Sequence, residues 1–283
     1  MTHAFFFDMD GTLYETRKHA VSPLTQYALE QLKKKGYHVS VISSRSIHEL
    51  ANLQKSVKCF PFDIWVLEGG ALILDREDGS RTQSTMDPEL VSRFAEYALQ
   101  SGLVWRYTTL EGNWFGTKPG LEERYSMNHL YLNAPVYKRF DPAADRAMNI
   151  VVWTADPIRK RDILEQFPGH STVVYFGCVE IRAPGVSKED ALRQLKQKHH
   201  YGDVICFGDG ANDAAMLKAA DTGVAMGNGC DAVKEAADYV IGSIQEDGIY
   251  HFLQEHHIIP PAPRETLQTE EPDWDQRDLP DEL

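Results

Sequence analysis

A short apolar run that ends in two carboxylates constrains the fold of this chain more than any other feature. Residues 4–7 are Ala-Phe-Phe-Phe, and Asp8-Met9-Asp10-Gly11-Thr12 follow at once. The run has the length and aromatic content of a short buried strand, and Gly11 permits a tight turn off the end of a sheet. Asp8 and Asp10 are therefore expected at a strand's carboxyl end, where open parallel α/β sheets bind ligands. A solvated turn is the alternative, because Asp and Gly are ordinary turn residues.

Strand-like and helix-like segments alternate through the first part of the chain. Residues 23–35 carry apolar side chains at helical spacing, and residues 38–42 form a strand-like run. A helix is expected over residues 46–56, and residues 63–74 are typical of two strands joined by a double-glycine turn. This alternation predicts βαβ units and a parallel sheet.

The middle of the chain, residues 84–184, has a different pattern. Two expected helices, 87–100 and 156–167, interrupt aromatic-rich strands, which is typical of an α+β unit with an antiparallel sheet. From residue 185 the regular alternation returns. We therefore expect an α/β protein in which a parallel-sheet core, residues 1–83 and 185–258, is interrupted by an inserted domain.

Composition excludes several classes of partner. The 283 residues are 42% hydrophobic and 25% charged, as in ordinary globular proteins. No apolar run approaches the roughly 20 residues that span a bilayer, and no export signal precedes Asp8, so we expect a cytoplasmic protein without a membrane domain. The net charge of -13 argues against a nucleic-acid partner. The sequence does not predict an oligomeric state.

The end of the chain is acidic and rich in proline. From residue 261 onward there are eight acidic residues and two arginines, a net charge of -6. Such a segment cannot bury enough apolar surface to offset its ordering entropy. Residues 259–283 are therefore expected to form a disordered acidic tail.

Three further segments place reactive groups at expected strand ends or helix starts. Ser43 follows the second strand, Lys188 begins a helix, and Asp209 and Asp213 flank a glycine turn after another strand. Several carboxylates at one sheet edge would repel each other unless a cation lies among them, and oxygen ligands alone favour Mg²⁺. Asp8 and Asp209 are the expected ligands.

These residue types suit phosphoryl transfer. A carboxylate such as Asp8 can attack phosphorus and form an aspartyl-phosphate when a metal, a cation and hydroxyl donors neutralise the phosphoryl group. Lys188 and Ser43 would supply the cation and the hydroxyl. Asp10 would protonate the leaving alkoxide and later deprotonate the attacking water.

The four segments resemble the four motifs of the haloacid dehalogenase (HAD) superfamily, and GDGANDAAML with GVAMGNG is similar to its Cof-type phosphatase branch. The resemblance extends from Phe5 to about Leu253 and covers nearly the whole chain. It implies a Rossmann-like core, a substrate cap formed by residues 84–184, and a Mg²⁺-dependent phosphomonoester hydrolase. The implied substrate is a small phosphorylated metabolite such as a sugar phosphate, hydrolysed through an aspartyl-phosphate.

The resemblance also implies a role for each matching residue. Asp8 would be the nucleophile, and Asp10 the acid and base whose backbone carbonyl also binds the metal. The implied metal group is Asp8, Asp10, Asp209 and Asp213, and the implied phosphate-binding group is Ser43, Ser44, Lys188 and Asn212. Lys188 also belongs to the catalytic set.

Two segments depart from the family pattern, and the second departure leaves the substrate class open. Ser43-Ser44-Arg45 stands where Thr-Gly-Arg is usual, and Glu68-Gly69-Gly70-Ala71 stands where Glu-Asn-Gly-Ala is common. A phosphomutase of the same fold and a non-catalytic metal-binding regulatory protein are the alternative functions. Outside the motifs, we expect surface positions for the cations Arg106, Lys118, Arg124 and Arg182 and for the pairs His199-His200 and His256-His257.

Overall fold

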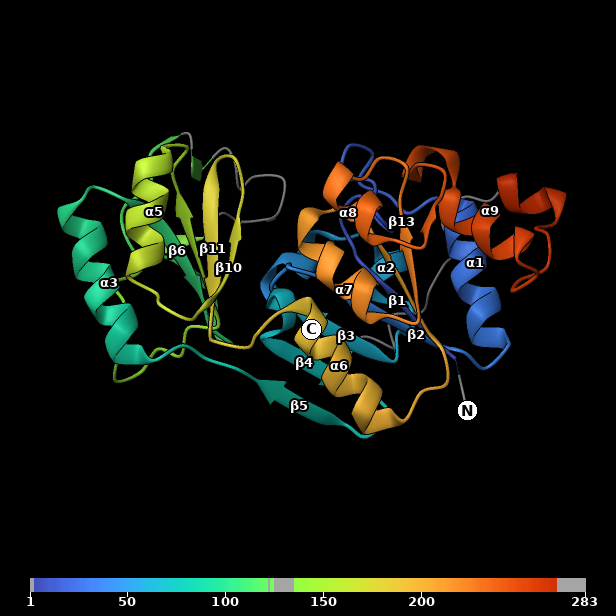
Figure 1. The fold of residues 1–283 in the computed structure, drawn as a ribbon, viewed down its shortest axis with the longest axis horizontal. Coiled ribbons are helices and arrows are strands. Elements are labelled where there is room, and N and C mark those ends of the chain that lie inside the picture. Colours follow the sequence, from blue (N-terminus) through green and yellow to red (C-terminus); the bar gives the residue numbers. More distant parts are fainter. Residues whose placement is uncertain (1–2, 122, 125–134, 269–283) are drawn as a thin grey trace. The chain divides into compact units, whose positions relative to one another are not determined.

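The chain folds into two compact units. The computed structural model describes residues 3–121, 123–124 and 135–268 (Figure 1). Unit 1 comprises Met1–Ser44, Leu53–Arg81 and Lys188–Leu283, and unit 2 comprises Arg45–Asn52 and Thr82–Ser187. Residues 45–52 thus belong with unit 2, although the expected core range 1–83 includes them.

Unit 1 is built on a mostly parallel sheet. Among its described residues, eight strands follow the order β14-β13-β12-β1-β2-β3-β4-β5. Their bounds are β1 Ala4–Phe7, β2 His38–Ile42, β3 Ile64–Leu67, β4 Leu72–Asp75, β5 Ser80–Gln83, β12 Val204–Gly208, β13 Thr222–Ala225 and β14 Tyr239–Val240. Strands from β14 to β3 are parallel, and β4 runs antiparallel to β3. The predicted α/β class with a parallel-sheet core is confirmed.

Helices cover both faces of this sheet. Their bounds are α1 Pro23–Lys34, α2 Lys55–Lys58, α6 Lys188–His199, α7 Ala214–Ala219, α8 Asp231–Ala236 and α9 Gly248–Glu255. Phe6 of β1 is buried in a cluster that includes side chains of α6, α7 and α8. Phe7 has the opposite parity and stacks on Phe207, which contacts Phe252 of α9. Because successive side chains of a strand point to opposite faces, β1 is buried from both sides.

The helix expected over residues 46–56 takes a different form. Residues Ile47–Asn52 form a 3₁₀ helix, and only the short α2 is α-helical. Ser46 Oγ accepts a hydrogen bond from the backbone N of Glu49, and the Glu49 carboxylate accepts one from the backbone N of Ser46. These reciprocal bonds span three residues and favour the tighter 3₁₀ turn.

Unit 2 contains a second, mainly antiparallel sheet. Its described strands follow the order β10-β11-β9-β6-β7-β8, and β7 and β8 pair in parallel. The bounds are β6 Val104–Thr108, β7 Asn113–Phe115, β8 Val136–Tyr137, β9 Asn149–Trp153, β10 Ser171–Val174, β11 Cys178–Arg182, α3 Pro88–Gln100 and α5 Pro157–Glu165. Phe94 of α3 packs against Trp105 of β6 and against Phe167, which follows α5. This packing buries one face of the sheet.

The start of the expected tail is ordered against unit 1. Ile259 is buried, Tyr27 Oη of α1 donates to the backbone O of Pro261, and residues Arg264–Gln268 form a 3₁₀ helix. The expectation of disorder is therefore wrong for residues 259–268. Residues 269–283 lie outside the described part of the chain.

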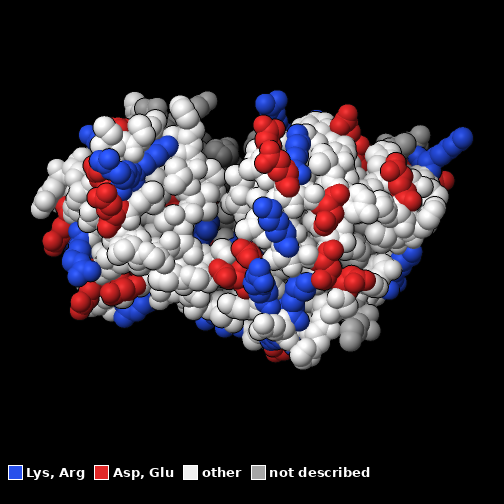
Figure 2. All heavy atoms as spheres, viewed as in Figure 1, with Lys and Arg blue, Asp and Glu red and all other residues white. Residues whose placement is uncertain are grey.

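Charges of both signs are spread over the face drawn in Figure 2, where Lys and Arg are interspersed with Asp and Glu. Binding to a nucleic-acid backbone uses a concentrated basic stripe instead. None of the helices in the described residues is long and apolar enough to cross a bilayer.

Candidate active site

Two aspartates emerge side by side from adjacent strands. Asp8 directly follows β1 and Asp209 directly follows β12, and Phe7 is in register with Phe207 in this parallel pair. The backbone N of Asp8 donates to the backbone O of Phe207 at 2.9 Å, so the pairing continues to the edge. Both carboxylates therefore lie at the carboxyl edge of the sheet, as ligand sites do in this fold class.

Lys188 connects two of the carboxylates. Asp8 shares the parity of Phe6, whose face α6 covers, and Lys188 is the first residue of α6. Its Nζ donates to Asp8 Oδ1 at 2.5 Å and to Asp213 Oδ1 at 2.7 Å, and the lysine side chain is 3% exposed. A buried charge of this kind persists because it is paired on two sides.

Asp213 is held mainly by hydrogen bonds within the site. Its Oδ1 accepts from Lys188, and its Oδ2 accepts from the backbone N of Asp209 at 3.1 Å and of Gly210 at 2.9 Å. Both oxygens therefore have donors, and Asp213 fixes the lysine and the turn that carries Asp209.

The carboxylates are close enough to share a cation. One oxygen from each of Asp8, Asp209 and Asp213 lies within 4.8 Å of the others. Burial, and then the charge of Asp213, raise the pKa of Asp8 well above its usual value. Burial also raises the pKa of Asp209 to about 6, although a hydrogen bond from Thr12 opposes the shift. A divalent ion would relieve this repulsion, and an all-oxygen donor set fits Mg²⁺.

The same charges act in the opposite sense on the lysine. Burial alone would lower the pKa of Lys188, but the charges of Asp213 and Asp8, with their hydrogen bonds to the lysine, outweigh it and raise that pKa above its ordinary value. The two carboxylates therefore favour the charged form of Lys188. It can neutralise an anion placed beside Asp8.

Gly11 and Thr12 form a close contact that the sequence analysis did not predict. Gly11 has φ of +87°, and a Cβ atom there would lie 2.2 Å from Asp209 Oδ2. The Thr12 hydroxyl donates to Asp209 Oδ1 at 2.7 Å. The first turn thus holds the second carboxylate in position. A hydroxyl directly after the glycine was the available signal in the sequence.

The remaining predicted site residues are Ser43, Ser44, Asn212 and Asp10. Ser44 Oγ accepts from Asn212 Nδ2 at 3.1 Å, so these two meet. Ser43 is buried at the end of β2, with its backbone N donating to the backbone O of Val66 at 2.8 Å. Asp10 is half-buried, and its negative charge contributes to the raised pKa of Asp209.

Asn228 is a supporting residue that sequence reasoning missed. Its Nδ2 donates to the backbone O of Gly11 at 2.8 Å, and its Oδ1 accepts from the backbone N of Ile244 at 2.9 Å. The side chain therefore ties the first turn to the C-terminal part of unit 1. Its position between two glycines was the only local signal.

Some expectations for residues outside the motifs are wrong. Arg106 and Arg182 are buried in unit 2, where they pair with Glu49 and Glu180 at 2.7 Å each. Lys118 and Arg124 are exposed, as expected. The His199 side chain is only 11% exposed, and its ring nitrogens contact the carboxylates of Asp75 and Glu77, whereas His200, His256 and His257 are exposed. Contacts with carboxylates compensate the burial of these side chains, a feature that a residue-by-residue expectation of exposure misses.

Comparisons with known proteins agree with this geometry. A family model described as haloacid dehalogenase-like hydrolase matches residues 5–253. The 5-amino-6-(5-phospho-D-ribitylamino)uracil phosphatase YcsE of Bacillus subtilis is 28% identical over 244 residues, 86% of this chain and 90% of the relative. The pyridoxal phosphate phosphatase YbhA of Escherichia coli is 26% identical over 287 residues, 91% of this chain and 99% of the relative. A solved sugar phosphatase of HAD subclass IIB matches with a TM-score of 0.79 at 25% identity, over 91% of this chain and 100% of that one.

Proposed function

We propose that this chain, which belongs to the haloacid dehalogenase-like hydrolase family, is a Mg²⁺-dependent phosphatase that hydrolyses a small phosphorylated metabolite through an aspartyl-phosphate. Family membership confirms the predicted superfamily, fold and enzyme class. The metal, the intermediate and the substrate rest on the geometry of the site and on the relatives.

One observation carries the proposal: Asp8 is buried and held by Lys188 through one oxygen only. The lysine contacts Oδ1, and no described residue hydrogen bonds to Oδ2. A carboxylate held in this way keeps one oxygen for attack, while the cation beside it can neutralise an incoming phosphoryl group. A solvated turn would not bury and pair these groups.

The chemistry follows from these positions. Asp8 Oδ2 forms a bond to phosphorus as the bond from phosphorus to the substrate oxygen breaks, and Asp10 donates a proton to that oxygen. Asp10 then takes a proton from a water that attacks phosphorus. The bond between phosphorus and Asp8 breaks, and free phosphate and the aspartate are released. When bound by Asp8, Asp209 and Asp213, with the Asp10 carbonyl, Mg²⁺ would neutralise charge on the phosphoryl oxygens.

Hydroxyl and amide donors would complete the phosphate site. Ser43 follows β2, the parallel neighbour of β1, and therefore lies at the same sheet edge as Asp8, where its hydroxyl could donate to a phosphoryl oxygen. Ser44 and Asn212 are held together by their hydrogen bond. With Lys188 they offer the fixed donors that stabilise charge on the equatorial oxygens during phosphoryl transfer.

The relatives support a small phosphorylated substrate. Two of them are named for different metabolites, a phosphoribitylamino-uracil and pyridoxal phosphate, and the matched structure is a sugar phosphatase. All three names describe phosphate esters of small molecules. A sugar phosphate or a similar metabolite is therefore our proposed substrate class.

Product analysis over a panel of phosphorylated metabolites tests the proposal. We expect free phosphate to be released with Mg²⁺ and release to stop when a chelator is added. Asp8→Asn should abolish release, whereas Asp203→Asn, a matched change of a 67% exposed aspartate, should leave it intact. An isomerised phosphosugar without free phosphate would identify a phosphomutase instead. Release that persists in Asp8→Asn would exclude the covalent mechanism.

A further inference from the structure

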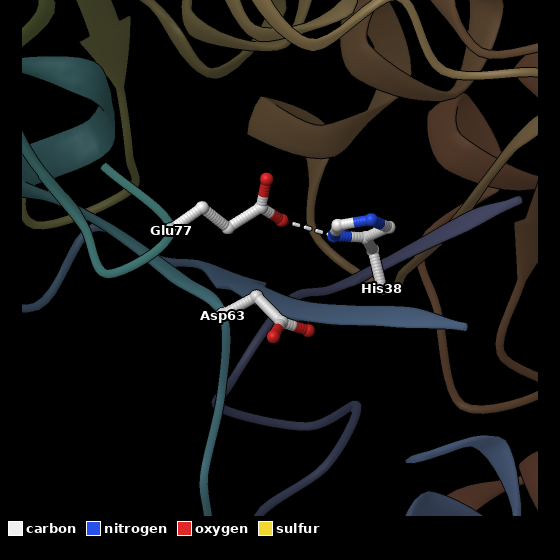
Figure 3. Close-up of side chains that lie close together, drawn as sticks. All are labelled: His38, Asp63 and Glu77. Atoms are coloured by element: carbon white, nitrogen blue, oxygen red, sulfur yellow. Dashed lines mark ion pairs between the residues drawn. The ribbon is translucent and has the colours of Figure 1, made fainter. Parts of the chain in front are cut away.

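A second group of metal-ligating side chains lies in unit 1, away from the site just described. It consists of His38, Asp63 and Glu77, each with a ligand atom within 4.8 Å of the other two. Figure 3 shows the Glu77 carboxylate directed at the His38 ring, with the Asp63 carboxylate beside them. We call these three residues the edge cluster.

The edge cluster lies at the opposite end of the strands from the aspartates of the candidate active site. His38 is the first residue of β2, Asp63 directly precedes β3, and Glu77 follows β4, which runs antiparallel to β3. Parallel strands begin at one edge of a sheet and end at the other. The edge cluster therefore joins three chain segments at the amino-terminal edge of the sheet.

One ring nitrogen of His38 faces the Glu77 carboxylate. Its Nδ1 is buried and lies against Glu77 Oε1, yet it makes no hydrogen bond of acceptable geometry with any described residue. Its ring packs against Tyr201 at 4.9 Å between centroids, which fixes the ring plane. An imidazole nitrogen that carries no proton can bind a cation together with a neighbouring carboxylate oxygen.

The charge balance of the neighbourhood points in the same direction. Lys33 Nζ pairs with Asp63 at 2.5 Å, and Lys198 Nζ pairs with Asp75 at 2.6 Å. Among the described side chains, the Glu77 carboxylate contacts the rings of His38 and His199 and no Lys or Arg side chain. A bound cation would balance the charge of this carboxylate.

We propose that His38, Asp63 and Glu77 bind a divalent cation of the zinc class, distinct from the ion of the phosphatase site. One imidazole nitrogen with two carboxylate oxygens is a donor set typical of Zn²⁺, while Mg²⁺ and Ca²⁺ prefer oxygen alone. Asp63 already accepts hydrogen bonds from Lys33 and from the backbone N of Val39, but a carboxylate has about four acceptor sites.

A further histidine would hold one of these ligands in place. His199 Nδ1 contacts the other Glu77 oxygen at 2.9 Å, and His199 Nε2 contacts Asp75 Oδ2 at 2.7 Å. Tyr201 stacks on the His199 ring at 5.2 Å. Such supporting contacts orient metal ligands, so His199 and Asp75 act as positioning residues.

The proposed ion would fasten β2, β3 and the turn after β4 to the end of α6. Because it binds the folded chain and takes no part in phosphoryl transfer, the proposal does not depend on the proposed function. Zinc at a hundredfold excess over its dissociation constant should raise the midpoint of thermal unfolding by roughly 5 °C or more.

Zinc binding to the full chain in excess Mg²⁺ tests this proposal, because Mg²⁺ saturates the oxygen-only site. We expect one Zn²⁺ per chain by equilibrium dialysis and elemental analysis. His38→Ala and Glu77→Gln should each weaken binding at least about 100-fold, and His199→Ala should weaken it about tenfold. Glu77 follows β4 in a turn, so Glu77→Gln provides a folded variant if His38→Ala is unstable.

Two controls separate the sites. The first control is His3→Ala. The backbone O of His3 accepts a hydrogen bond from the backbone N of His38, and the His3 ring pairs with Asp203. Zinc binding should be unchanged in this variant. Asp209→Asn should also leave zinc binding intact. The proposal would be overturned if the wild-type chain bound no zinc in excess Mg²⁺. It would also be overturned if Glu77→Gln bound zinc as well as the wild type, or if Asp209→Asn lost zinc binding. None of these readouts measures phosphate release, so their outcome is independent of the outcome of the phosphatase assay.

Discussion

Gly11→Ala is the substitution whose effect the structure specifies most closely. The new Cβ would lie 2.2 Å from Asp209 Oδ2, and the backbone φ there is +87°. Gly36→Ala is the matched control, because Gly36 has φ of +77° and its Cβ would meet nothing within 4 Å. Both variants share the backbone strain, and only Gly11→Ala adds a collision with a candidate metal ligand.

The two effects have different expected sizes. A side chain at positive φ costs on the order of 1 to 3 kcal/mol of folding free energy, and both variants should lose about this much. To reach ordinary contact distance the Asp209 carboxylate must move by roughly 1 Å, and such a misplacement can cost about 100-fold in rate. That loss corresponds to about 2.7 kcal/mol of transition-state stabilisation.

Steady-state hydrolysis of p-nitrophenyl phosphate at saturating Mg²⁺, together with urea unfolding, separates these effects. We expect Gly11→Ala to lose about 100-fold in kcat/KM and to need more Mg²⁺ for half-maximal rate. Gly36→Ala should keep nearly full activity despite a similar loss of stability. Equal kcat/KM values for the two variants would show that the close approach of Gly11 to Asp209 does not affect catalysis.

Three further substitutions test other parts of the structure. Lys188→Met removes the fixed cation and should lower kcat about 100-fold to 1000-fold. Circular dichroism should show that the variant is folded, and a small change in kcat would contradict the role of Lys188. Thr12→Val removes the hydroxyl bonded to Asp209 and should lower kcat/KM about tenfold, and an unchanged value would count against that contact. Burial raises the pKa of Asp145, but hydrogen bonds from Lys138, the backbone N of Asp141 and Tyr107, together with the charge of Lys138, outweigh burial and lower that pKa. In urea titrations Asp145→Asn should be about 2 kcal/mol less stable than wild type at pH 7, because Lys138 is 37% exposed and solvent screens the pair. This difference should begin to shrink at about pH 4 and be lost as the pH falls through the lowered pKa of folded Asp145, whereas a constant difference would refute the ion pair.

The parts of the site that lie at strand ends could be predicted from the sequence. Apolar runs mark β1 and β12, and the residues just after them, Asp8 and Asp209, are placed by strand geometry alone. Lys188 begins α6, so its position at a helix start was also readable. Their chemical roles remain predictions.

The contacts between distant segments could not be predicted. Thr12 and Asp209 are 197 residues apart in the chain, and their hydrogen bond exists only because β12 is the neighbour of β1. Local patterning does not reveal that strand order. The 3₁₀ helix over Ile47–Asn52 was missed for another reason, since the Ser46–Glu49 hydrogen bonds compete with a regular helix.

The buried charges of unit 2 illustrate the same limit. Arg106 and Glu49 are 57 residues apart and pair at 2.7 Å in the interior of that unit. A lone arginine in a sequence is expected at the surface, because burial requires a partner. The partner here comes from the 3₁₀ segment that precedes the insertion.

Trapping the covalent intermediate is the most direct test of nucleophilic attack by Asp8. Wild-type enzyme is mixed with a turned-over phosphomonoester and Mg²⁺, quenched in acid within one turnover, digested and examined by mass spectrometry. We expect a phosphoryl group on the peptide that contains Asp8 in the wild-type enzyme and no such group in Asp8→Asn. Rapid phosphate release without that label, or the label on a different residue, would contradict it.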